Sequence, residues 1–478
     1  MNKPGTTIFF SFIMAIGAAS LFFPSCKEKS MEGMIIITRS TEKPQKTNYI
    51  TTDSRRYIPQ SQIVELDPGK PGKELKVLTS GFWSAFSPSI SDDARFMLFA
   101  AKQKQNDPWQ IYEMNLGNSK IRQITASPEN CFNPSYLPNG RMIFSKASGN
   151  DTAKAVQSLF TCNPDGSDIK RITFNKNSFS GSTILKDGRV LTISQQFYPS
   201  KRDPEIFVLR PDGTKAELLY MGNEGCTFSG RGHETNNGKI VFVESDKSGL
   251  NKGDIISISY NRPLHSRINL TSEIKGDFNT VCPIQTGRFL VTCRQSEAER
   301  YSLYEFDPEK MTLGRSLYNS KEYDVFDAVL VEKHERAKKL PSEVDMGVKT
   351  GLILCQDINV SGQKSTAIAS SMPKASGIEV IGMDSTLGVV RVEEDGSFYL
   401  KVIADTPFRI QTIDEKGNVL HGPCGWIWLR PNERRGCVGC HEDPEMVPGN
   451  RVPRSVKKAP VNIPVHVNKV VEKKVSLE

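Results

Sequence analysis

A repeat with a period of about 48 residues constrains the fold of this chain more than any other feature of its sequence. Each unit contains a tight turn, a basic residue and a short apolar strand, and further strands follow. The turns begin at Asp93, Asn139, Asp187, Asn237 and Thr286, so the intervals between them are 46, 48, 50 and 49 residues. Asn-Gly and Asp-Gly turns between strands are strong hairpin signals. A period in the high forties with about four strands predicts the blades of a β-propeller.

The first unit is incomplete, and this predicts how the ring closes. Residues 34–79 contain three strand-like segments, and a spare one follows the sixth unit at 324–331. We expect residues 324–331 to supply the innermost strand of the first blade, because this pairing removes the free edge of the sheet. The predicted propeller then has six blades over residues 33–332.

A second β domain follows the repeats. Residues 333–348 are charged and contain Pro341, which is typical of a linker. Strand-like segments then recur, with turns at Asp395-Gly396 and near Gly417. This pattern predicts a small antiparallel β-sandwich over residues 349–448. The expected fold class is therefore all-β, with a six-bladed β-propeller followed by a sandwich.

The two ends of the chain carry targeting and charge signals. Residues 1–25 combine Lys3 with an apolar run and precede Cys26, as in the signal peptide of a bacterial lipoprotein. We therefore expect an exported protein, in the periplasm or at the cell surface, anchored to a membrane by lipid on Cys26. Part of the net charge of +8 lies in residues 449–478, which we interpret as a solvated basic tail. Contact of this tail with anionic lipid or an acidic partner is the alternative, and the sequence shows no nucleic-acid-binding motif.

One short motif near the end of the sandwich carries chemistry. Cys437 and Cys440 are three positions apart and His441 follows directly, which is the CxxCH pattern of covalent haem c attachment. Two thiols at this spacing reach the two vinyl groups of one haem, and the histidine then lies under the iron as an axial ligand. We therefore predict one haem c, bound by Cys437, Cys440 and His441 on an attachment loop of the sandwich.

The other face of the iron has three candidate occupants. Met446 follows His441 by five residues, so the chain has a reach of at most about 17 Å in which to pass the porphyrin rim. His421 lies twenty residues upstream of His441, which is far enough to approach from the opposite side, and it is the preferred candidate for the second axial ligand. An open or water-bound iron is the third option.

Zinc is the alternative to haem at this cluster. His421 and Cys424, followed by Cys437 and Cys440, have a spacing close to that of zinc fingers and supply four tetrahedral ligands. The zinc interpretation leaves His441 without a role, so we prefer haem.

Other residues are open to two interpretations. Three aromatic side chains either line a haem pocket or belong to the sandwich core: Phe408, Trp426 and Trp428. Trp109 is either an exposed anchor for a partner or a side chain packed between blades. Cys282 and Cys293 either form a disulfide or are two buried thiols. The remaining histidines are interpreted as structural or exposed: His233, His265, His334 and His466.

The residues around the motif resemble a known family. Residues 349–355, 404–411 and 425–431, which lead into the CxxCH motif, are similar to the middle domain of the hydrazine synthase alpha subunit family. Members of that family also place a TolB-like propeller ahead of this domain, and the repeats described above resemble TolB-like blades. The resemblance extends from about residue 33 to residue 463 and implies one covalent haem c on the sandwich. The family's alpha subunit also carries a further haem domain, whereas no second CxxCH follows in this sequence.

These observations lead to three functional hypotheses. The first is an exported, lipid-anchored c-type cytochrome that transfers electrons, with the propeller docking it to a redox partner such as another cytochrome. The second is a haem enzyme, similar to hydrazine synthase, that acts on a small nitrogen or oxygen compound. The third is a propeller binding module with a structural zinc at the Cys/His cluster. Electron transfer is the preferred hypothesis from sequence.

Overall fold

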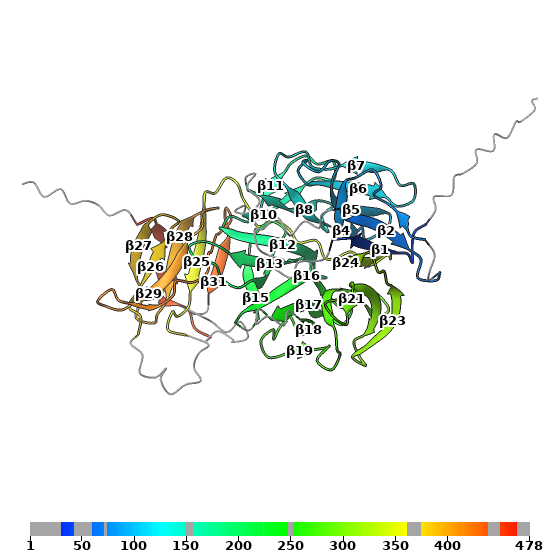
Figure 1. Cartoon of the computed structure of the whole chain (residues 1–478). Coiled ribbons are helices and arrows are strands. Elements are labelled where there is room, and N and C mark those ends of the chain that lie inside the picture. Colours follow the sequence, from blue (N-terminus) through cyan, green and yellow to red (C-terminus); the bar gives the residue numbers. More distant parts are fainter. Residues whose placement is uncertain are drawn as a thin grey trace, which may run out of the picture.

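The computed structural model describes residues 30–42, 60–70, 74–148, 156–222, 224–246, 252–360, 374–437 and 450–465. These residues form two β domains side by side (Figure 1). The larger domain ends with β24 (Asp324–Leu330), and the smaller one begins with β25 (Thr350–Cys355). No helix within the described ranges is long and apolar enough to cross a membrane. The predicted signal peptide and Cys26 lie outside these ranges.

The larger domain is a β-propeller of six four-stranded blades, as predicted. Blade 1 contains β24, β1 (Ile35–Ser40), β2 (Gln62–Leu66) and β3 (Lys76–Val77). Blade 2 contains β4 (Ser84–Ile90), β5 (Phe96–Lys102), β6 (Gln110–Asn115) and β7 (Ile121–Gln123). Blade 3 contains β8 (Cys131–Tyr136), β9 (Met142–Ala147), β10 (Gln157–Cys162) and β11 (Lys170–Arg171).

The other three blades have the same strand order. Blade 4 contains β12 (Asn177–Ile184), β13 (Val190–Gln196), β14 (Glu205–Leu209) and β15 (Glu217–Met221). Blade 5 contains β16 (Cys226–Glu234), β17 (Lys239–Asp246), β18 (Gly253–Ser259) and β19 (Ile268–Asn269). Blade 6 contains β20 (Asp277–Pro283), β21 (Phe289–Arg294), β22 (Ser302–Asp307) and β23 (Thr312–Tyr318).

The ring closes as predicted from the sequence. β24 pairs antiparallel with β1, from Leu330 opposite Ile35 to Asp324 opposite Ser40. β24 takes the innermost position of blade 1 and contacts β4 and β20 of the two neighbouring blades. The first and last strands of the propeller are thereby held in one sheet, which removes an unpaired edge.

A repeated threonine fixes the outer part of four blades. Its hydroxyl accepts a hydrogen bond from a backbone N–H in the third strand of the same blade. These N–H to hydroxyl bonds are Ile63 to Thr79 (3.0 Å), Ile111 to Thr125 (2.9 Å), Leu159 to Thr173 (2.9 Å) and Ile255 to Thr271 (3.0 Å). All four threonines are buried, so each bond satisfies a buried donor. In these four blades the sequence unit ends on this threonine, and the contact gives the physical reason.

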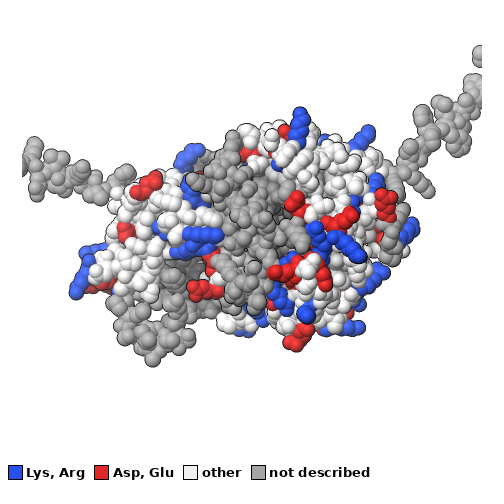
Figure 2. All heavy atoms as spheres, in the orientation of Figure 1, with Lys and Arg blue, Asp and Glu red and all other residues white. Residues whose placement is uncertain are grey.

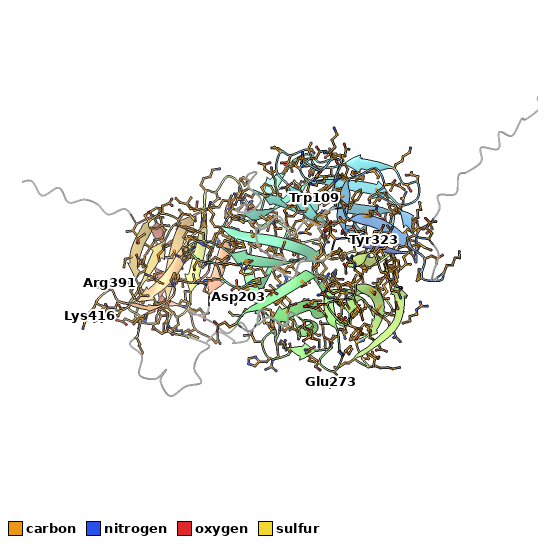
Figure 3. All side chains as sticks on the ribbon, viewed as in Figure 1. Trp109, Asp203, Glu273, Tyr323, Arg391 and Lys416 are labelled. Carbon is orange, nitrogen blue, oxygen red and sulfur yellow. The ribbon has the colours of Figure 1, made fainter. Side chains whose placement is uncertain are left out.

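The hydrophobic cores lie between neighbouring blades. Trp109 is 2% exposed and packs edge-to-face on Phe86, with 4.7 Å between ring centroids (Figure 3). It belongs to a buried cluster with Phe132 and Phe144 of blade 3. The interpretation of Trp109 as an exposed anchor is therefore wrong, and packing between blades is confirmed.

The two candidate disulfide cysteines of blade 6 do not face each other. Cys282 lies opposite Leu290, and Cys293 lies opposite Phe278. The hairpin turn around Thr286 sets this register, so the two sulfurs belong to different cross-strand pairs and form no disulfide. Burial raises the pKa of both thiols to about 12.

The smaller domain is a sandwich of two four-stranded sheets. One sheet has the order β31 (Arg434–Cys437), β25, β28 (Phe398–Ile403), β32 (Val461–Ile463). The other has the order β27 (Thr386–Arg391), β26 (Gly377–Ile381), β29 (Arg409–Ile413), β30 (Val419–His421). The edge strands β31 and β32 pair in parallel with β25 and β28. The first sheet is therefore mixed, whereas the sequence pattern predicted only antiparallel pairs.

Part of the predicted basic tail belongs to this sandwich. Residues 450–465 form a short 3-10 helix, η3 (Arg454–Lys457), and then strand β32. Lys458 pairs with Glu393 in the acidic turn before β28 at 2.7 Å. These residues are therefore part of the sandwich and not a separate tail, because they complete a sheet, while their basic side chains remain exposed beside that turn. Residues 466–478 lie outside the described ranges.

The predicted linker is fixed to the propeller. Residues 333–348 have no regular secondary structure, but the Lys338 N–H donates to the Lys186 carbonyl of blade 4 at 3.0 Å. Gly188 permits this approach, because a Cβ at that position would lie 1.9 Å from the Lys338 carbonyl oxygen.

Figure 2 shows acidic and basic side chains interspersed over the described atoms of the viewed face.

Candidate functional site

The structure places the first motif cysteine at one edge of the sandwich. Cys437 is the last residue of β31, is half-buried, and packs against the sandwich core. Its carbonyl accepts a hydrogen bond from the Gln356 N–H at 3.0 Å. Cys440 and His441 lie in residues 438–449, outside the described ranges.

The chain leaves and re-enters the described sandwich at one corner. Gln356 bonds to Cys437 through its N–H, and its carbonyl accepts a bond from Arg451 Nη2 at 3.1 Å. Arg451 also pairs with Asp357 at 3.2 Å. The two flanks of the motif segment therefore meet at the turn that follows β25. The same turn fixes both of them, which suits an attachment loop.

His421 lies on the same side of the sandwich as Cys437. It ends β30, where its N–H donates to Thr412 Oγ1 at 3.1 Å. Strands β27 and β32 meet at one side of the sandwich, where the Val465 N–H donates to the Leu387 carbonyl at 2.9 Å. The edge strands β30 and β31 therefore form the opposite side. His421, the predicted second axial ligand, is therefore on the side of the sandwich where the first motif cysteine lies.

The described residues do not assemble a zinc site. No three His, Cys, Asp or Glu side chains among them gather as a metal centre, so His421, Cys424 and Cys437 do not form one together. Cys424 instead accepts a hydrogen bond from the Ile410 N–H at 3.3 Å, and burial raises the pKa of its thiol. The first requirement of the zinc interpretation, three converging protein ligands, is not met by these side chains.

The structure shows what each of the three aromatic candidates contacts. Phe408 is buried in the sandwich core, as one interpretation of the sequence predicted. Trp428 is 1% exposed and enters the propeller, where it meets Phe179 of blade 4 edge-to-face at 6.1 Å between ring centroids. Trp426 donates from Nε1 to the Tyr198 carbonyl of blade 4 at 2.7 Å. Both tryptophans therefore join the two domains.

A buried carboxylate beside the motif strand was not found by sequence reasoning. Glu433 directly precedes β31 and is fully buried. One of its oxygens accepts bonds from the Lys215 N–H at 2.9 Å and from Arg435 at 2.7 Å, and the other accepts from the Arg430 N–H at 2.8 Å. Lys215 belongs to blade 4, so Glu433 ties the start of the motif strand to the propeller. A charge-assisted network of this kind fixes orientation.

Arg430 also joins the sandwich to blade 4 of the propeller. Its Nε donates to the Asp212 carbonyl at 3.0 Å, and its Nη1 donates to Asp405 at 2.6 Å. Its guanidinium also lies 4.6 Å from the ring centroid of Phe174. The sequence signal for both ties is the charged run from Arg430 to Arg435, which lies only a few residues before the motif.

Comparison with known proteins identifies relatives of both domains. Residues 322–442 match the hydrazine synthase alpha subunit middle domain. The match begins before β24, so it includes the closing strand, the linker and the CxxCH motif. The chain is also 25% identical over 517 aligned positions to hydrazine synthase subunit alpha of Kuenenia stuttgartiensis. That alignment covers 80% of this chain and 63% of the relative.

One solved structure extends the likeness to the overall fold. Kuenenia stuttgartiensis hydrazine synthase superimposes with a TM-score of 0.76 at 21% identity, covering 89% of this chain and 71% of the matched chain. TolB from Acinetobacter baumannii matches with a TM-score of 0.46 at 17% identity, over 65% of this chain and 69% of the other. The predicted resemblance to the hydrazine synthase alpha subunit family is therefore confirmed, with the middle domain matched over residues 322–442.

Proposed function

We propose that this chain is a haem c protein of the hydrazine synthase alpha type, whose haem iron binds a small nitrogen or oxygen compound. The observation that carries this proposal is the match over residues 322–442, which runs through Cys437, Cys440 and His441. This function was the second hypothesis from sequence, and the comparisons support it better than a role in electron transfer. The chain spans 63% of the length of its curated relative, so we propose the class of ligand and not the relative's whole reaction.

The described part of the site fits a covalent haem. Cys437 is half-buried at a sheet edge, where it packs against the apolar core of the sandwich. Cys437 and Cys440 would hold the porphyrin by thioethers, and His441 would bind the iron. A bound haem would supply an iron centre that coordinates small molecules and exchanges electrons with them.

The residues of this chain would orient such a group. The Glu433 network and the tryptophan contacts fix the strand that ends at Cys437 against blade 4. Preorganisation of this kind holds a site in one geometry. For the whole protein we propose an exported location, with lipid on Cys26 as the membrane anchor, on the basis of residues 1–26.

Electron transfer remains the second candidate function because of one observation. His421 and Cys437 lie on the same side of the sandwich, on the edge strands of the two sheets. If His421 binds the second face of the iron, the haem is six-coordinate and has no position for a substrate. The protein would then be an electron carrier for a redox partner, such as another cytochrome.

Covalent attachment is tested first. The chain is matured in a host with haem-loading machinery, separated on a denaturing gel and stained for haem. Wild type and Cys424→Ser should retain the stain, whereas Cys437→Ala and Cys440→Ala should each lose about half of the covalent linkage or more. A colourless wild-type protein that contains one zinc per chain would overturn the haem proposal.

The two functions are then separated by a ligand-binding measurement. Carbon monoxide is mixed with the ferrous protein, and the rate of the spectral change is compared between wild type and His421→Ala. Rapid binding by wild type, unchanged in the variant, supports the open site of an enzyme. Slow binding by wild type that becomes rapid in His421→Ala supports the electron carrier and contradicts the enzyme proposal.

A further inference from the structure

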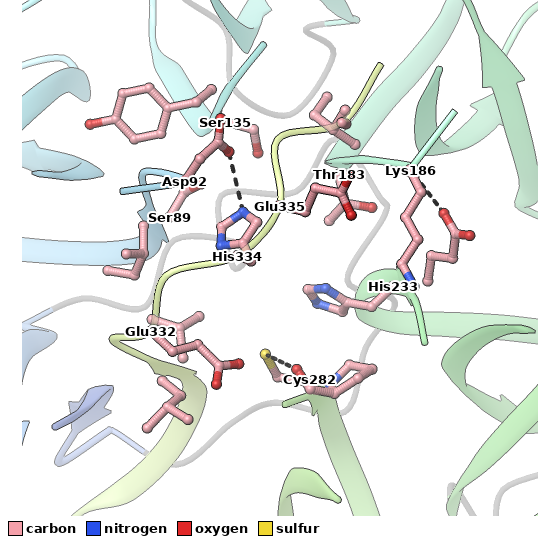
Figure 4. Close-up of a pocket in the computed structure, with 18 of the residues that line it drawn as sticks. Ser89, Asp92, Ser135, Thr183, Lys186, His233, Cys282, Glu332, His334 and Glu335 are labelled. Atoms are coloured by element: carbon pink, nitrogen blue, oxygen red, sulfur yellow. Dashed lines mark hydrogen bonds and ion pairs between the residues drawn. The ribbon is translucent and has the colours of Figure 1, made fainter. Parts of the chain in front are cut away.

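A cavity of about 650 Å³ lies at one mouth of the propeller's central channel (Figure 4). The inner strands of all six blades line it, and the beginning of the linker forms part of its rim. One lining residue from each blade, in order from blade 1 to blade 6, is Asp327, Ser89, Tyr136, Thr183, His233 and Cys282. A cavity of this size with several converging polar groups is typical of a small-molecule site.

Arg231 lines the cavity and bonds to other blades across the channel. Its side chain starts on blade 5 and crosses the channel, where Nη1 donates to Ser135 Oγ of blade 3 at 3.2 Å and to the Pro134 carbonyl at 3.3 Å. Nη2 donates to the Ser87 hydroxyl of blade 2. These acceptors are neutral, and within the described ranges Arg231 has no carboxylate as an ion-pair partner. The guanidinium therefore has no carboxylate in contact within the described ranges, and Asp327 attracts its charge from a greater distance.

The opposing charges come from blade 1. Asp327 lies on the closing strand β24, and Glu332 lies just after it. Within the described ranges neither carboxyl group forms an ion pair. Burial raises the pKa of both, and for Glu332 a hydrogen bond from the Gln285 N–H at 3.0 Å opposes this effect. Positive and negative groups thus face one cavity without contacting each other.

The other titratable groups do not neutralise this separation of charge. Burial and the nearby Arg231 lower the pKa of His233 to about 3, so its imidazole is neutral. Burial raises the pKa of Cys282 to about 12, so its thiol stays protonated. Figure 4 shows His233, Cys282 and Glu332 directed toward the same central space.

At the rim, Asp92 and Lys186 are already paired or bonded. Asp92 accepts a bond from His334 Nε2 at 3.2 Å and from Arg336 Nε at 2.9 Å. Lys186 donates from Nζ to the Asn236 carbonyl at 2.9 Å. Arg231 and the two carboxyls of blade 1 form no ion pair within the described ranges, although the charges of Arg231 and Asp327 attract each other.

Comparison of the six blades shows that Arg231 and Asp327 are exceptions to the sequence repeat. Each inner strand carries a phenylalanine, and the third residue after it is serine in three blades: Ser89, Ser135 and Ser182. Blade 5 has Arg231 at this position. The residue directly after the phenylalanine is Ser or Asn in five blades and Asp327 in blade 1. The repeat needs neither charge for its fold, because the other blades form the same strand without it.

We propose that this cavity binds a small zwitterion of the α-amino acid type, with its carboxylate toward Arg231 and its ammonium group toward Asp327 and Glu332. Charged groups that are partly withdrawn from water and form no ion pair are unfavourable, and one ligand that carries both signs supplies a contact partner to each. The neutral His233 and Cys282 would offer hydrogen bonds and contact to the remainder of the ligand.

Calorimetric titration of the purified full chain tests the class of ligand. A panel of amino acids is compared with matched analogues that lack one charge, such as alanine with propionate and ethylamine, and leucine with 4-methylpentanoate and 3-methylbutylamine. At least one amino acid should bind, and both of its analogues should bind about tenfold more weakly or worse. Equal binding of either analogue, or no binding by any amino acid, overturns the proposal.

A variant pair tests the assigned residues. Asp327→Asn should weaken the binding amino acid about tenfold, whereas Glu322→Gln, an exposed carboxylate just before β24, should leave binding unchanged. The melting temperature of both variants should equal that of wild type, which shows that the fold is intact. Loss of binding in Glu322→Gln, or unchanged binding in Asp327→Asn, contradicts the assignment.

Proton release gives a readout that a purely structural role would not produce. An ammonium group beside Asp327 favours its charged form, so binding should release protons as the pH falls toward the raised pKa of this carboxyl. The apparent binding enthalpy should then differ between buffers of different ionisation enthalpy. Asp327→Asn should reduce this difference; an unchanged difference would rule out Asp327 as the group that responds.

Discussion

Replacing Trp428 by alanine should uncouple the two domains and destabilise the propeller. The side chain is 1% exposed and lies among apolar residues of blades 3 and 4, including Leu137, Ile172 and Val190. Truncation of a fully buried aromatic side chain costs about 3–5 kcal/mol, because the transfer free energy is lost and a cavity remains. For a cooperative unit of roughly 300 residues this corresponds to a fall in Tm of about 5–8 °C.

A phenylalanine variant is the matched control. The indole Nε1 of Trp428 is buried and has no hydrogen-bond partner within the described ranges. Leaving such a donor unsatisfied costs about 1–3 kcal/mol, and Trp428→Phe removes that cost while it loses part of the ring contact. The two effects oppose each other, so this variant should lie within about 1 kcal/mol of wild type.

Differential scanning calorimetry and urea unfolding measure both variants. In wild type the propeller and sandwich should unfold in coupled transitions, and in Trp428→Ala the propeller transition should move to lower temperature. A Trp428→Ala protein within about 1 kcal/mol of wild type would refute the packing argument. A Trp428→Phe protein as unstable as Trp428→Ala would show that the indole N–H, and not the ring volume, is what the interface requires.

Three further predictions follow from the closing strand, the linker and the N-terminus. Deletion of residues 324–331 should lower the Tm of the propeller far more than deletion of residues 466–478, because it exposes the edge of β1; equal values would contradict the closure. The Asp92 carboxylate raises the pKa of His334 in the folded protein. The pair therefore gives its full stabilisation below the pKa that histidine has in the unfolded chain, and loses it as the pH rises through the raised pKa of the folded state. His334→Asn should therefore cost under about 1 kcal/mol near pH 5.5 and less above pH 8, as measured by urea unfolding, because the pair is half exposed. Cys26→Ser should move the protein from the membrane to the soluble fraction on centrifugation, and continued pelleting with membranes would refute lipid anchoring.

The sequence determined the features that repeat or that depend on neighbours along the chain. The spacing of the turns predicted six blades, and the incomplete first unit predicted the pairing of 324–331 with the first strand, which β24 and β1 form. Both are short-range signals, because a hairpin register is set by its own turn and each blade repeats the same pattern. The CxxCH motif is local in the same sense, and its Cys437 ends an edge strand of the sandwich.

Only the tertiary structure decided which distant residues meet. Trp428 looked like a wall for a bound group or a core residue of its own domain, but its partner is Phe179 of blade 4. The tail looked separate from the sandwich because its basic residues were counted without the acidic turn that they contact. Arg231 and Asp327 were ordinary charges in the sequence until the closed ring placed them at one cavity. Contacts of this kind join residues that the chain order separates by tens to hundreds of positions, and no local pattern of polarity records the identity of the partner.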